Sequence, residues 1–147
     1  MTGKNEVSYK ERRNNIYKDN EMYLFGFELW LKNKGLSTKT INMHVTNLAF
    51  YLNDYLCYYD LIEAHQGCRA YHIHGFLGSW FIRKAAWSSS AHIKSNAAGI
   101  KKFYEYLLEE DFIEQEDYDD LCDTIKEFMP DWLEEMRRYE EMIFEEY

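Results

Sequence analysis

The chain has 147 residues, of which 46% are hydrophobic and 18% aromatic, and its formal net charge is −9. This length is typical of a single domain, and the apolar content argues against an intrinsically disordered chain. No apolar run is long enough to cross a bilayer, and the polar N-terminus does not resemble a signal peptide. Cys57, Cys68 and Cys122 are odd in number and far apart, which argues against a disulfide framework and favours a cytoplasmic chain with reduced thiols.

Charge is distributed unevenly along the chain. Residues 1–104 hold 14 basic and 8 acidic side chains, a net charge of +6, whereas residues 105–147 hold 3 and 18, a net charge of −15. Such a division is typical of a nucleic-acid-binding part joined to an acidic tail. It is equally typical of a helical C-terminus whose acids only keep the chain in solution, so charge alone does not identify a partner.

The pattern of apolar residues predicts an all-α protein. There is one proline, and the long segments repeat at the helical period rather than alternating as strands do. We expect a compact bundle of four core helices, arranged as two helical hairpins, followed by two acidic C-terminal helices. Within this single domain, residues 1–16 are expected to form a loosely ordered arm, residues 17–112 the four-helix unit, and residues 113–147 the acidic helical pair.

The first two helices are predicted over residues 17–34 and 38–56, on either side of a short turn. Gly35 has the position of a glycine just past a helix end, where a left-handed backbone is needed. Ser37 has the position of an N-cap. On the second helix, the face opposite its apolar stripe is polar and carries no acidic residue before Asp54. The stripe of the second helix recurs at steps of three and four, at Ile41, Val45, Leu48, Leu52 and Tyr55.

Two further helices are predicted over residues 68–86 and 91–109. Gly75 and Gly78 lower the helix propensity of the third helix, but they would also allow another helix to pack closely. The serines at positions 88–90 predict a loop that ends in the N-cap of the fourth helix. The fourth helix has an apolar stripe on one side and, on the other, a sector that contains Lys94, Ser95, Ala98, Lys101 and Lys102.

Acidic residues dominate the rest of the chain. A fifth helix is predicted over residues 118–128, with Asp117 as its cap, and Pro130 is expected to end it. Asp131 is then expected to cap a sixth helix over residues 132–145. The apolar stripe of the sixth helix is expected to pack back onto the four-helix core, although it would also suit a protein partner; it comprises Trp132, Met136, Tyr139 and Ile143.

Three segments follow one another in an order that occurs in a known family. The first is residues 27–31 leading into the Gly-Leu-Ser turn and the Thr-Ile start of the second helix, at residues 35–41. The second is residues 73–81. The third is the serine-capped segment 88–95, followed by the Phe-Tyr-Glu-Tyr-Leu run at residues 103–107. Together they resemble the N-terminal core-binding, or SAM-like, domain of phage-integrase-type tyrosine recombinases.

The resemblance covers roughly residues 20–112 and implies a four-helix domain that clamps one side of double-stranded DNA with its second and fourth helices. Lysine pairs with phosphates, asparagine can read adenine edges, and serine and threonine bond phosphates, so the side chains on these faces are suitable. The implied role is an accessory module in DNA integration or recombination, with a recombinase or another protein as a further partner. The implied DNA contacts are Lys39, Asn42, Thr46, Asn47, His92, Lys94, Ser95, Lys101 and Lys102.

A catalytic part of the recombinase type is not found in the sequence. That part would supply an arginine, a lysine, a His-x-x-Arg pair and a tyrosine nucleophile, and no His-x-x-Arg occurs here. Tyr147 has no activating cluster, so strand cleavage is not expected and no catalytic residue is assigned. The fourth helix is also less basic than in the family, with Ser95 and Ala98 where arginine would be unremarkable, which predicts modest affinity for DNA.

Other constellations of reactive side chains carry less weight. Cys68, His72 and His74 do not share one helix face and lack a fourth ligand, so no metal site is predicted. No phosphate-binding glycine loop and no nucleophile elbow occur, so neither a cofactor nor an enzyme activity is expected. The alternative function is a protein–protein interaction module, in which the acidic C-terminal helices cover or replace the DNA face.

Overall fold

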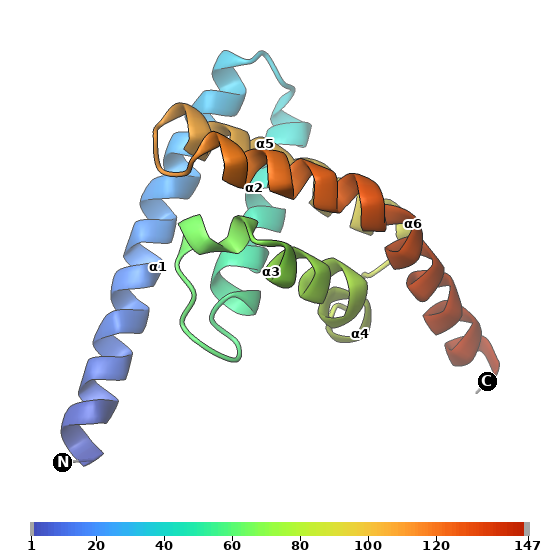
Figure 1. The fold of residues 1–147 in the computed structure, drawn as a ribbon, viewed down its shortest axis with the longest axis horizontal. Helices are drawn as coiled ribbons and strands as arrows, with labels where there is room; N and C mark the ends of the chain where they lie inside the picture. The colour runs from blue at the N-terminus through green and yellow to red at the C-terminus, as the bar shows by residue number, and fades with distance from the viewer. Residues whose placement is uncertain (1, 146–147) are drawn as a thin grey trace. The chain divides into compact units, whose positions relative to one another are not determined.

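The computed structural model describes the backbone of residues 2–145 and the side chains of residues 8–145. Every regular element in this part of the chain is helical (Figure 1), which confirms the predicted all-α class. None of the described helices combines the length and the apolar composition needed to cross a bilayer. The elements divide into two compact units, Met1–Gly67 and Cys68–Tyr147.

Unit 1 is built from α1 (Thr2–Asn33), α2 (Thr38–Ala49) and the π-helical segment η1 (Phe50–Tyr55), which continues α2. α1 packs against both α2 and η1. The predicted apolar stripe of the second helix faces inward, because its side chains are buried or half-buried. The core of this unit includes Phe27, Leu31, Ile41, Leu48, Tyr51 and Leu52.

The start of α1 differs from the prediction. The helix already begins at Thr2, where the sequence predicted a loosely ordered arm over residues 1–16. Residues 4–25 contain neither proline nor glycine, so nothing in the chain interrupts the helix once it has formed. Most side chains of residues 8–15 are exposed, and this polarity suggested an irregular segment when only the sequence was considered.

The turn between α1 and α2 has the predicted geometry. Gly35 has φ of +82°, and its backbone N–H donates to the carbonyl of Lys32 at 3.0 Å. The N–H of Leu36 donates to the carbonyl of Leu31 at 3.3 Å, which completes a Schellman motif. Ser37 then caps α2, because its hydroxyl accepts a bond of 3.2 Å from the backbone N–H of Thr40.

Two polar contacts within unit 1 join segments that are distant in sequence. Asn20 on α1 is 1% exposed, and its Nδ2 donates to Oδ1 of Asn53 on η1 at 2.8 Å. The buried hydroxyl of Tyr51 donates to the carbonyl of Gly67 at 2.7 Å. The second bond fixes the chain after η1, where residues 56–63 make an irregular connection to the 3₁₀ segment η2 (Ala64–Cys68).

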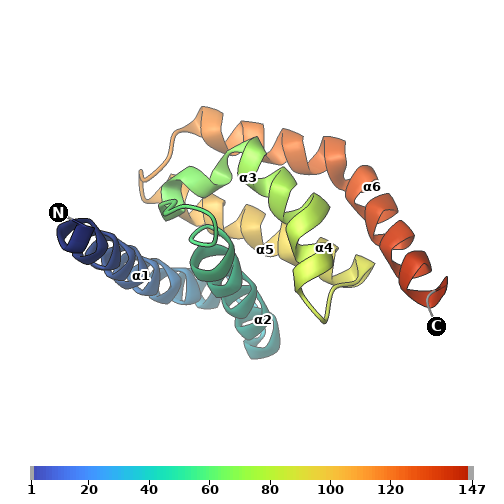
Figure 2. The ribbon, with the colours of Figure 1, turned by 90° about the horizontal axis from the view of Figure 1, so that it is seen from below.

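Unit 2 contains a helical run formed by α3 (Ala70–Gly75), the π-helical η3 (Phe76–Trp80) and α4 (Phe81–Lys84), then α5 (Ser90–Glu109) and α6 (Gln115–Glu145). The run and α5 match the predicted third and fourth helices to within two residues at each end. α6 packs against α3, η3, α4 and α5, and Figure 2 shows it beside α3 and α4. The core of this unit includes Ile73, Phe76, Leu77, Phe81, Ile100, Phe103, Tyr104, Leu107, Leu121 and Trp132.

The acidic C-terminal part is one helix, not the predicted pair. Pro130 lies inside α6, where its missing N–H normally ends or bends a helix. Apolar side chains on both sides of it are buried, Leu121 before it and Trp132 and Met136 after it. Burial of both halves outweighs the missing hydrogen bond, and Figure 1 shows α6 changing direction instead of ending.

The two predicted helix caps in this region change accordingly. Asp131 lies within α6 and does not cap a separate helix. Asp117 lies in the first turn of α6, where its carboxylate accepts a bond of 3.0 Å from the backbone N–H of Glu114, as the acidic residue of a capping box does. Along the predicted apolar stripe only the first part is buried, since Tyr139 is half-buried and Ile143 is exposed.

Gly78 on η3 permits a close contact with α6, as the sequence suggested. A Cβ atom at this position would lie 2.8 Å from Cδ1 and 3.0 Å from Nε1 of Trp132. The indole nitrogen of Trp132 also donates a hydrogen bond of 2.9 Å to Nδ1 of His74. Trp132 therefore docks the second half of α6 onto the helical run in two ways. Its ring occupies the space that the absence of a side chain at Gly78 leaves, and its N–H bonds to His74.

Candidate nucleic-acid interface

Four of the predicted DNA contacts lie on α2 in unit 1. Lys39, Asn42 and Thr46 are exposed and Asn47 is half-buried, on the side of the helix away from the buried stripe. The exposed Met43 lies among them. This face therefore offers one cation, two amides and a hydroxyl, a set that can bond both phosphates and base edges but contributes little net charge.

The other five predicted contacts lie on α5 in unit 2. His92, Lys94 and Lys101 are exposed, whereas Ser95 and Lys102 are half-buried. Lys94 and Lys101 are seven residues apart, so two helical turns, about 10.5 Å along the axis, separate them. We call the strip of exposed residues on this helix the α5 face. It consists of Ala91, His92, Lys94, Ala98 and Lys101.

The two alanines of the α5 face make the helix backbone accessible. Ala91 and Ala98 are both exposed, and each has only a methyl group beyond its Cα. A large partner can therefore approach the helix axis closely between the lysines. Gly99, which follows Ala98, is buried and does not belong to this surface.

His92 takes part in the cap of α5. The backbone N–H of His92 donates to Oγ of Ser89 at 3.1 Å, and Nδ1 of the same histidine lies 2.8 Å from that Oγ. A serine caps the helix as predicted, but the cap is Ser89, one residue before the end of the serine run where the sequence placed it. A DNA contact through Nδ1 of His92 would have to replace its bond with Ser89, so we regard Lys94 and Lys101 as the better candidates.

Asn96 on α5 was missed when only the sequence was considered. It is 1% exposed, and its Nδ2 donates to the carbonyl of His92 at 2.8 Å. Its Oδ1 is buried and has no hydrogen-bond partner among the described residues. Buried amide groups normally have hydrogen-bond partners. In the sequence, the sign of this unusual buried amide is a polar residue on the apolar side of the helix.

The lysines of the α5 face are electrostatically available. Among the described residues, neither Lys94 nor Lys101 has an acidic side chain within ion-pair distance. Both lysines are exposed although α6, the acidic helix, packs against α5. The acidic helix therefore leaves Lys94 and Lys101 on this face of α5 exposed.

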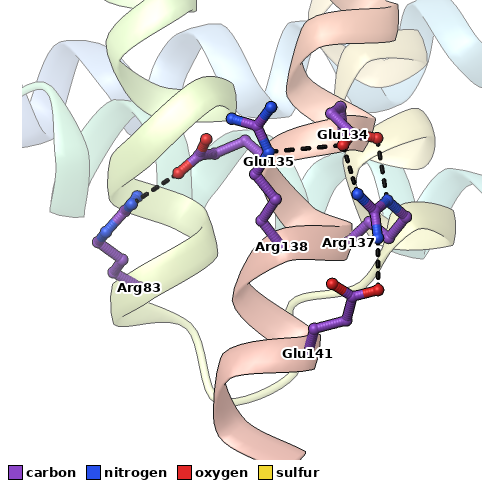
Figure 3. A network of polar contacts seen from close by, with 6 residues as sticks. All are labelled: Arg83, Glu134, Glu135, Arg137, Arg138 and Glu141. Atoms are coloured by element: carbon purple, nitrogen blue, oxygen red, sulfur yellow. Dashed lines mark hydrogen bonds and ion pairs between the residues drawn. The ribbon is translucent and has the colours of Figure 1, made fainter.

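The arginines of α6, in contrast, are paired with acids of the same helix (Figure 3). Arg137 donates from Nε and Nη2 to the two carboxylate oxygens of Glu134, at 3.0 and 2.6 Å, and from Nη1 to Glu141. Arg138 lies 3.5 Å from Glu134. The hydrogen bond from Arg137 holds the pKa of the Glu134 carboxyl below its usual value. Neither guanidinium is thus a free cation for phosphate binding.

One further ion pair links α6 to the helical run of unit 2. Nη2 of Arg83 on α4 lies 2.8 Å from Oε1 of Glu135, and Figure 3 shows the two side chains pointing toward each other. Arg83 follows Ser79 by one helical turn and lies within 3.4 Å of its carbonyl and hydroxyl oxygens. Arg83 consequently serves to hold α6, so it is not counted with the α5 face.

The first half of α6 forms the wall of an acidic hollow. Its volume is about 340 Å³, and Asp117, Asp120, Asp123 and Glu127 line it together with Cys68 and Arg69. Burial raises the pKa of the Cys68 thiol to about 11, and the charge of Asp117 acts in the same direction. No group of three or more His, Cys, Asp or Glu side chains in the described part of the chain is placed to hold a metal ion.

The described site residues can thus bond an anion. Two lysines flank small residues on α5, and amides and a hydroxyl lie on α2. Side chains of these kinds contact phosphates in protein–DNA complexes. Comparisons of the chain with protein-family models, with curated proteins and with solved structures found no match.

Proposed function

We propose that this protein is a non-catalytic DNA-binding module, an accessory to DNA integration or recombination, that contacts the phosphate backbone through the α5 face and through the polar face of α2. The observation that supports it most is the pair of exposed lysines, Lys94 and Lys101, without acidic partners. Lysines in that state can neutralise DNA phosphates, and the counterions that the DNA then releases favour binding.

The small residues beside these lysines support the same proposal. Ala91 and Ala98 allow a phosphate strand to approach the backbone of α5, so both lysines can reach phosphates without being fully extended. Lysine contacts of this kind position a protein on the duplex but carry no base information. Any sequence preference would come from the amides of Asn42 and Asn47, which suit adenine edges.

The test is binding of a fluorescent DNA duplex over a series of salt concentrations. The logarithm of the binding constant falls linearly with the logarithm of the salt concentration, and each lost phosphate contact makes this slope less steep by about 0.9. We expect Lys94→Gln and Lys101→Gln each to weaken binding and to reduce the slope by about one. The matched control is Lys126→Gln, which removes an exposed lysine of α6 outside the α5 face.

The outcome that would refute the proposal is specific. Absence of binding even at low salt would refute DNA binding by this chain. Equal losses for Lys126→Gln and Lys94→Gln would show that only the net charge matters and would remove the α5 face from the proposal. Because all three side chains are exposed, none of these substitutions threatens the core.

A second candidate function is a protein-interaction module for a basic partner. The observation that favours it is the charge of α6, which has 12 acidic and 3 basic residues, with both arginines of the helix paired to acids. The surface that remains is strongly anionic and would attract a cationic protein segment while repelling DNA. Because Trp132 and Met136 of α6 are core residues, deleting the helix would unfold unit 2 and would not test this function.

Charge neutralisation on α6 separates the two functions without loss of the core. In the variant Glu116→Gln, Asp123→Asn, Glu127→Gln, three exposed acids are replaced by amides of the same shape. A DNA-binding module in which α6 only repels the duplex should bind more tightly in this form, as fewer anions oppose it. If neither the variant nor the unmodified protein binds a duplex, the interaction module becomes the better proposal.

A further inference from the structure

Arg13 on α1 is a half-buried cation without an anionic partner. No acidic side chain among the described residues lies within ion-pair distance of it. Its Nε is buried without a hydrogen-bond partner in the described part of the chain, whereas its two terminal nitrogens are not among these buried atoms. Arginine is seldom withdrawn from water without an anion beside it, so this side chain is a first sign of a negatively charged ligand.

The surroundings of Arg13 on α1 hold the guanidinium in place but leave its charge unopposed. Cζ of Arg13 lies 5.9 Å from the centre of the Tyr17 ring, within the range of a cation–π contact. Lys10 is exposed and precedes Arg13 by three residues, so the two cations lie on the same side of the helix. An anion that binds Arg13 is therefore also within reach of Lys10.

Two exposed tyrosines follow η1 in the irregular connection to η2. Tyr58 is 52% exposed and Tyr59 is 77% exposed, and their ring centroids lie 4.7 Å apart in an edge-to-face arrangement. Such a contact covers no more than one face of one ring, so flat aromatic surface remains open to solvent. The acid that follows them is engaged locally, because Oδ1 of Asp60 accepts a bond of 2.8 Å from the backbone N–H of Leu61.

The connection that carries the tyrosines lies beside the part of α1 that carries Arg13 (Figure 1). Burial raises the pKa of the Cys57 thiol, and a backbone hydrogen bond from Ile62 and the charge of Arg13 oppose this rise, so Arg13 and Cys57 are neighbours. Asp54 acts on the same thiol but forms no ion pair with Arg13. The residues directly after Cys57 are the two exposed tyrosines, so unit 1 brings open cations and open rings together.

This combination restricts the chemistry of the ligand. Residues 8–18 hold four basic side chains and one acidic side chain, so the ligand must be an anion. In single-stranded nucleic acid each nucleotide carries a phosphate and an unpaired base that can stack on an aromatic ring. A duplex also offers phosphates, but its bases stack on one another and present only their edges in the grooves. An acidic peptide supplies the charge without the flat rings.

We propose that this surface of unit 1 binds a single-stranded segment of nucleic acid, with a phosphate on Arg13 and Lys10 and a base stacked on the ring of Tyr59. The site does not depend on the proposed duplex contact, because none of its residues belongs to the α5 face or to the polar face of α2. Stacking is available to every base, so this contact adds little sequence preference.

The experiment measures the fluorescence anisotropy of a labelled oligothymidylate of about 12 nucleotides, titrated with the full chain over a series of salt concentrations. Tyr59→Ala should weaken binding about tenfold, because it removes one stacked base, whereas Tyr59→Phe keeps the ring and should bind normally. Arg13→Gln should weaken binding and make the dependence on salt less steep by about 0.7, the value for one phosphate contact on a single strand.

Two matched control variants should leave the affinity for the oligothymidylate unchanged. Tyr71→Ala removes a tyrosine of α3 that is 83% exposed and belongs to unit 2. Arg12→Gln removes an exposed arginine that lies about 100° around α1 from Arg13. Because Tyr59, Tyr71 and Arg12 are all exposed, their substitution does not threaten the core.

A labelled duplex and a labelled oligoglutamate, each measured in parallel, separate this proposal from its alternatives. Binding of the single strand without the duplex would support this site while refuting the proposed duplex contact. Four results would overturn the proposal: no binding of the oligothymidylate even at low salt, equal binding of the oligoglutamate, equal losses for Tyr59→Ala and Tyr71→Ala, and equal losses for Arg13→Gln and Arg12→Gln.

Discussion

The indole Nε1 of Trp132 donates a hydrogen bond of 2.9 Å to Nδ1 of His74. The indole N–H can only donate, so His74 must accept with an unprotonated Nδ1. Trp132 is 1% exposed, so its indole meets almost no water while the imidazole is in place. A single polar pair thus specifies how the second half of α6 docks onto α3, within an otherwise apolar contact that includes Phe128 beside His74.

A double-mutant cycle should measure this pair. His74→Ala removes the acceptor of the Trp132 N–H, and we expect a loss of about 1 kcal/mol in the free energy of unfolding, because His74 is exposed and water can partly replace its ring. Trp132→Phe removes the donor and leaves space behind. In urea denaturation, the double variant should be less destabilised than the sum of the single variants, by about 1 kcal/mol. Strictly additive losses would show that the hydrogen bond contributes nothing to stability.

Two glycines should respond to alanine for different physical reasons. Gly78→Ala places a methyl group 2.8 Å from the Trp132 ring, and we expect a cost of about 1–3 kcal/mol despite the better helix propensity of alanine. Gly35→Ala meets no atom within 4 Å but must adopt φ of +82°, at a cost of about 1–2 kcal/mol.

The background Trp132→Leu distinguishes these two causes. Leucine has no ring at the position of the clash, so Gly78→Ala should be nearly neutral or stabilising in that background. The cost of Gly35→Ala should persist, since the φ angle of its turn does not depend on Trp132. Unfolding in urea measures both effects, and an undiminished cost of Gly78→Ala beside leucine would contradict the proposed clash.

Local rules were sufficient to predict the elements of this fold that depend on neighbouring residues. The Schellman glycine at Gly35 and the caps at Ser37 and Ser89 follow from side chains within a few positions. Pro130 was misjudged because the burial of Trp132 and Met136, a tertiary effect, decides whether α6 continues. The division into two units likewise depends on which helices α6 contacts, and no short pattern encodes that choice.

The candidate sites show the same limit. Helical spacing was enough to predict that Lys39, Lys94 and Lys101 are exposed, because spacing fixes the face of an amphipathic helix. It could not predict that Arg83 pairs with Glu135, a residue 52 positions later.

The cap of α5 should contribute measurably to stability. Oγ of Ser89 accepts a bond of 3.1 Å from the backbone N–H of His92, one of the N–H groups that a helix start leaves without a partner. Ser89→Ala should cost about 1 kcal/mol, whereas Ser89→Asp should retain most of the stability. Ser90→Ala is the control, because Ser90 is the first residue of the helix and not its cap. An equal loss for Ser90→Ala in thermal or urea unfolding would contradict this assignment.

Alkaline pH should destabilise the protein through its buried thiols and a buried phenol. Burial raises the pKa of Cys68 from its usual value of 9.0 to about 11, and it raises those of Cys57 and Tyr104 as well. Between pH 9 and pH 11 the folded chain therefore holds protons that the unfolded chain releases. The free energy of unfolding must then fall as the pH rises, so this contribution is fully present below pH 9 and is lost toward pH 11.

Urea midpoints at pH 8, 9 and 10 measure this loss, and Cys68→Ala tests its main source. The variant should be slightly less stable at pH 8, because a buried sulfur is removed, but its stability should depend less steeply on pH. Iodoacetamide provides a second measurement, since only a thiolate reacts and Cys68 is 3% exposed. Cys68 in the folded protein should be alkylated far more slowly at pH 8 than in urea, and equal rates would show that its thiol is neither buried nor shifted.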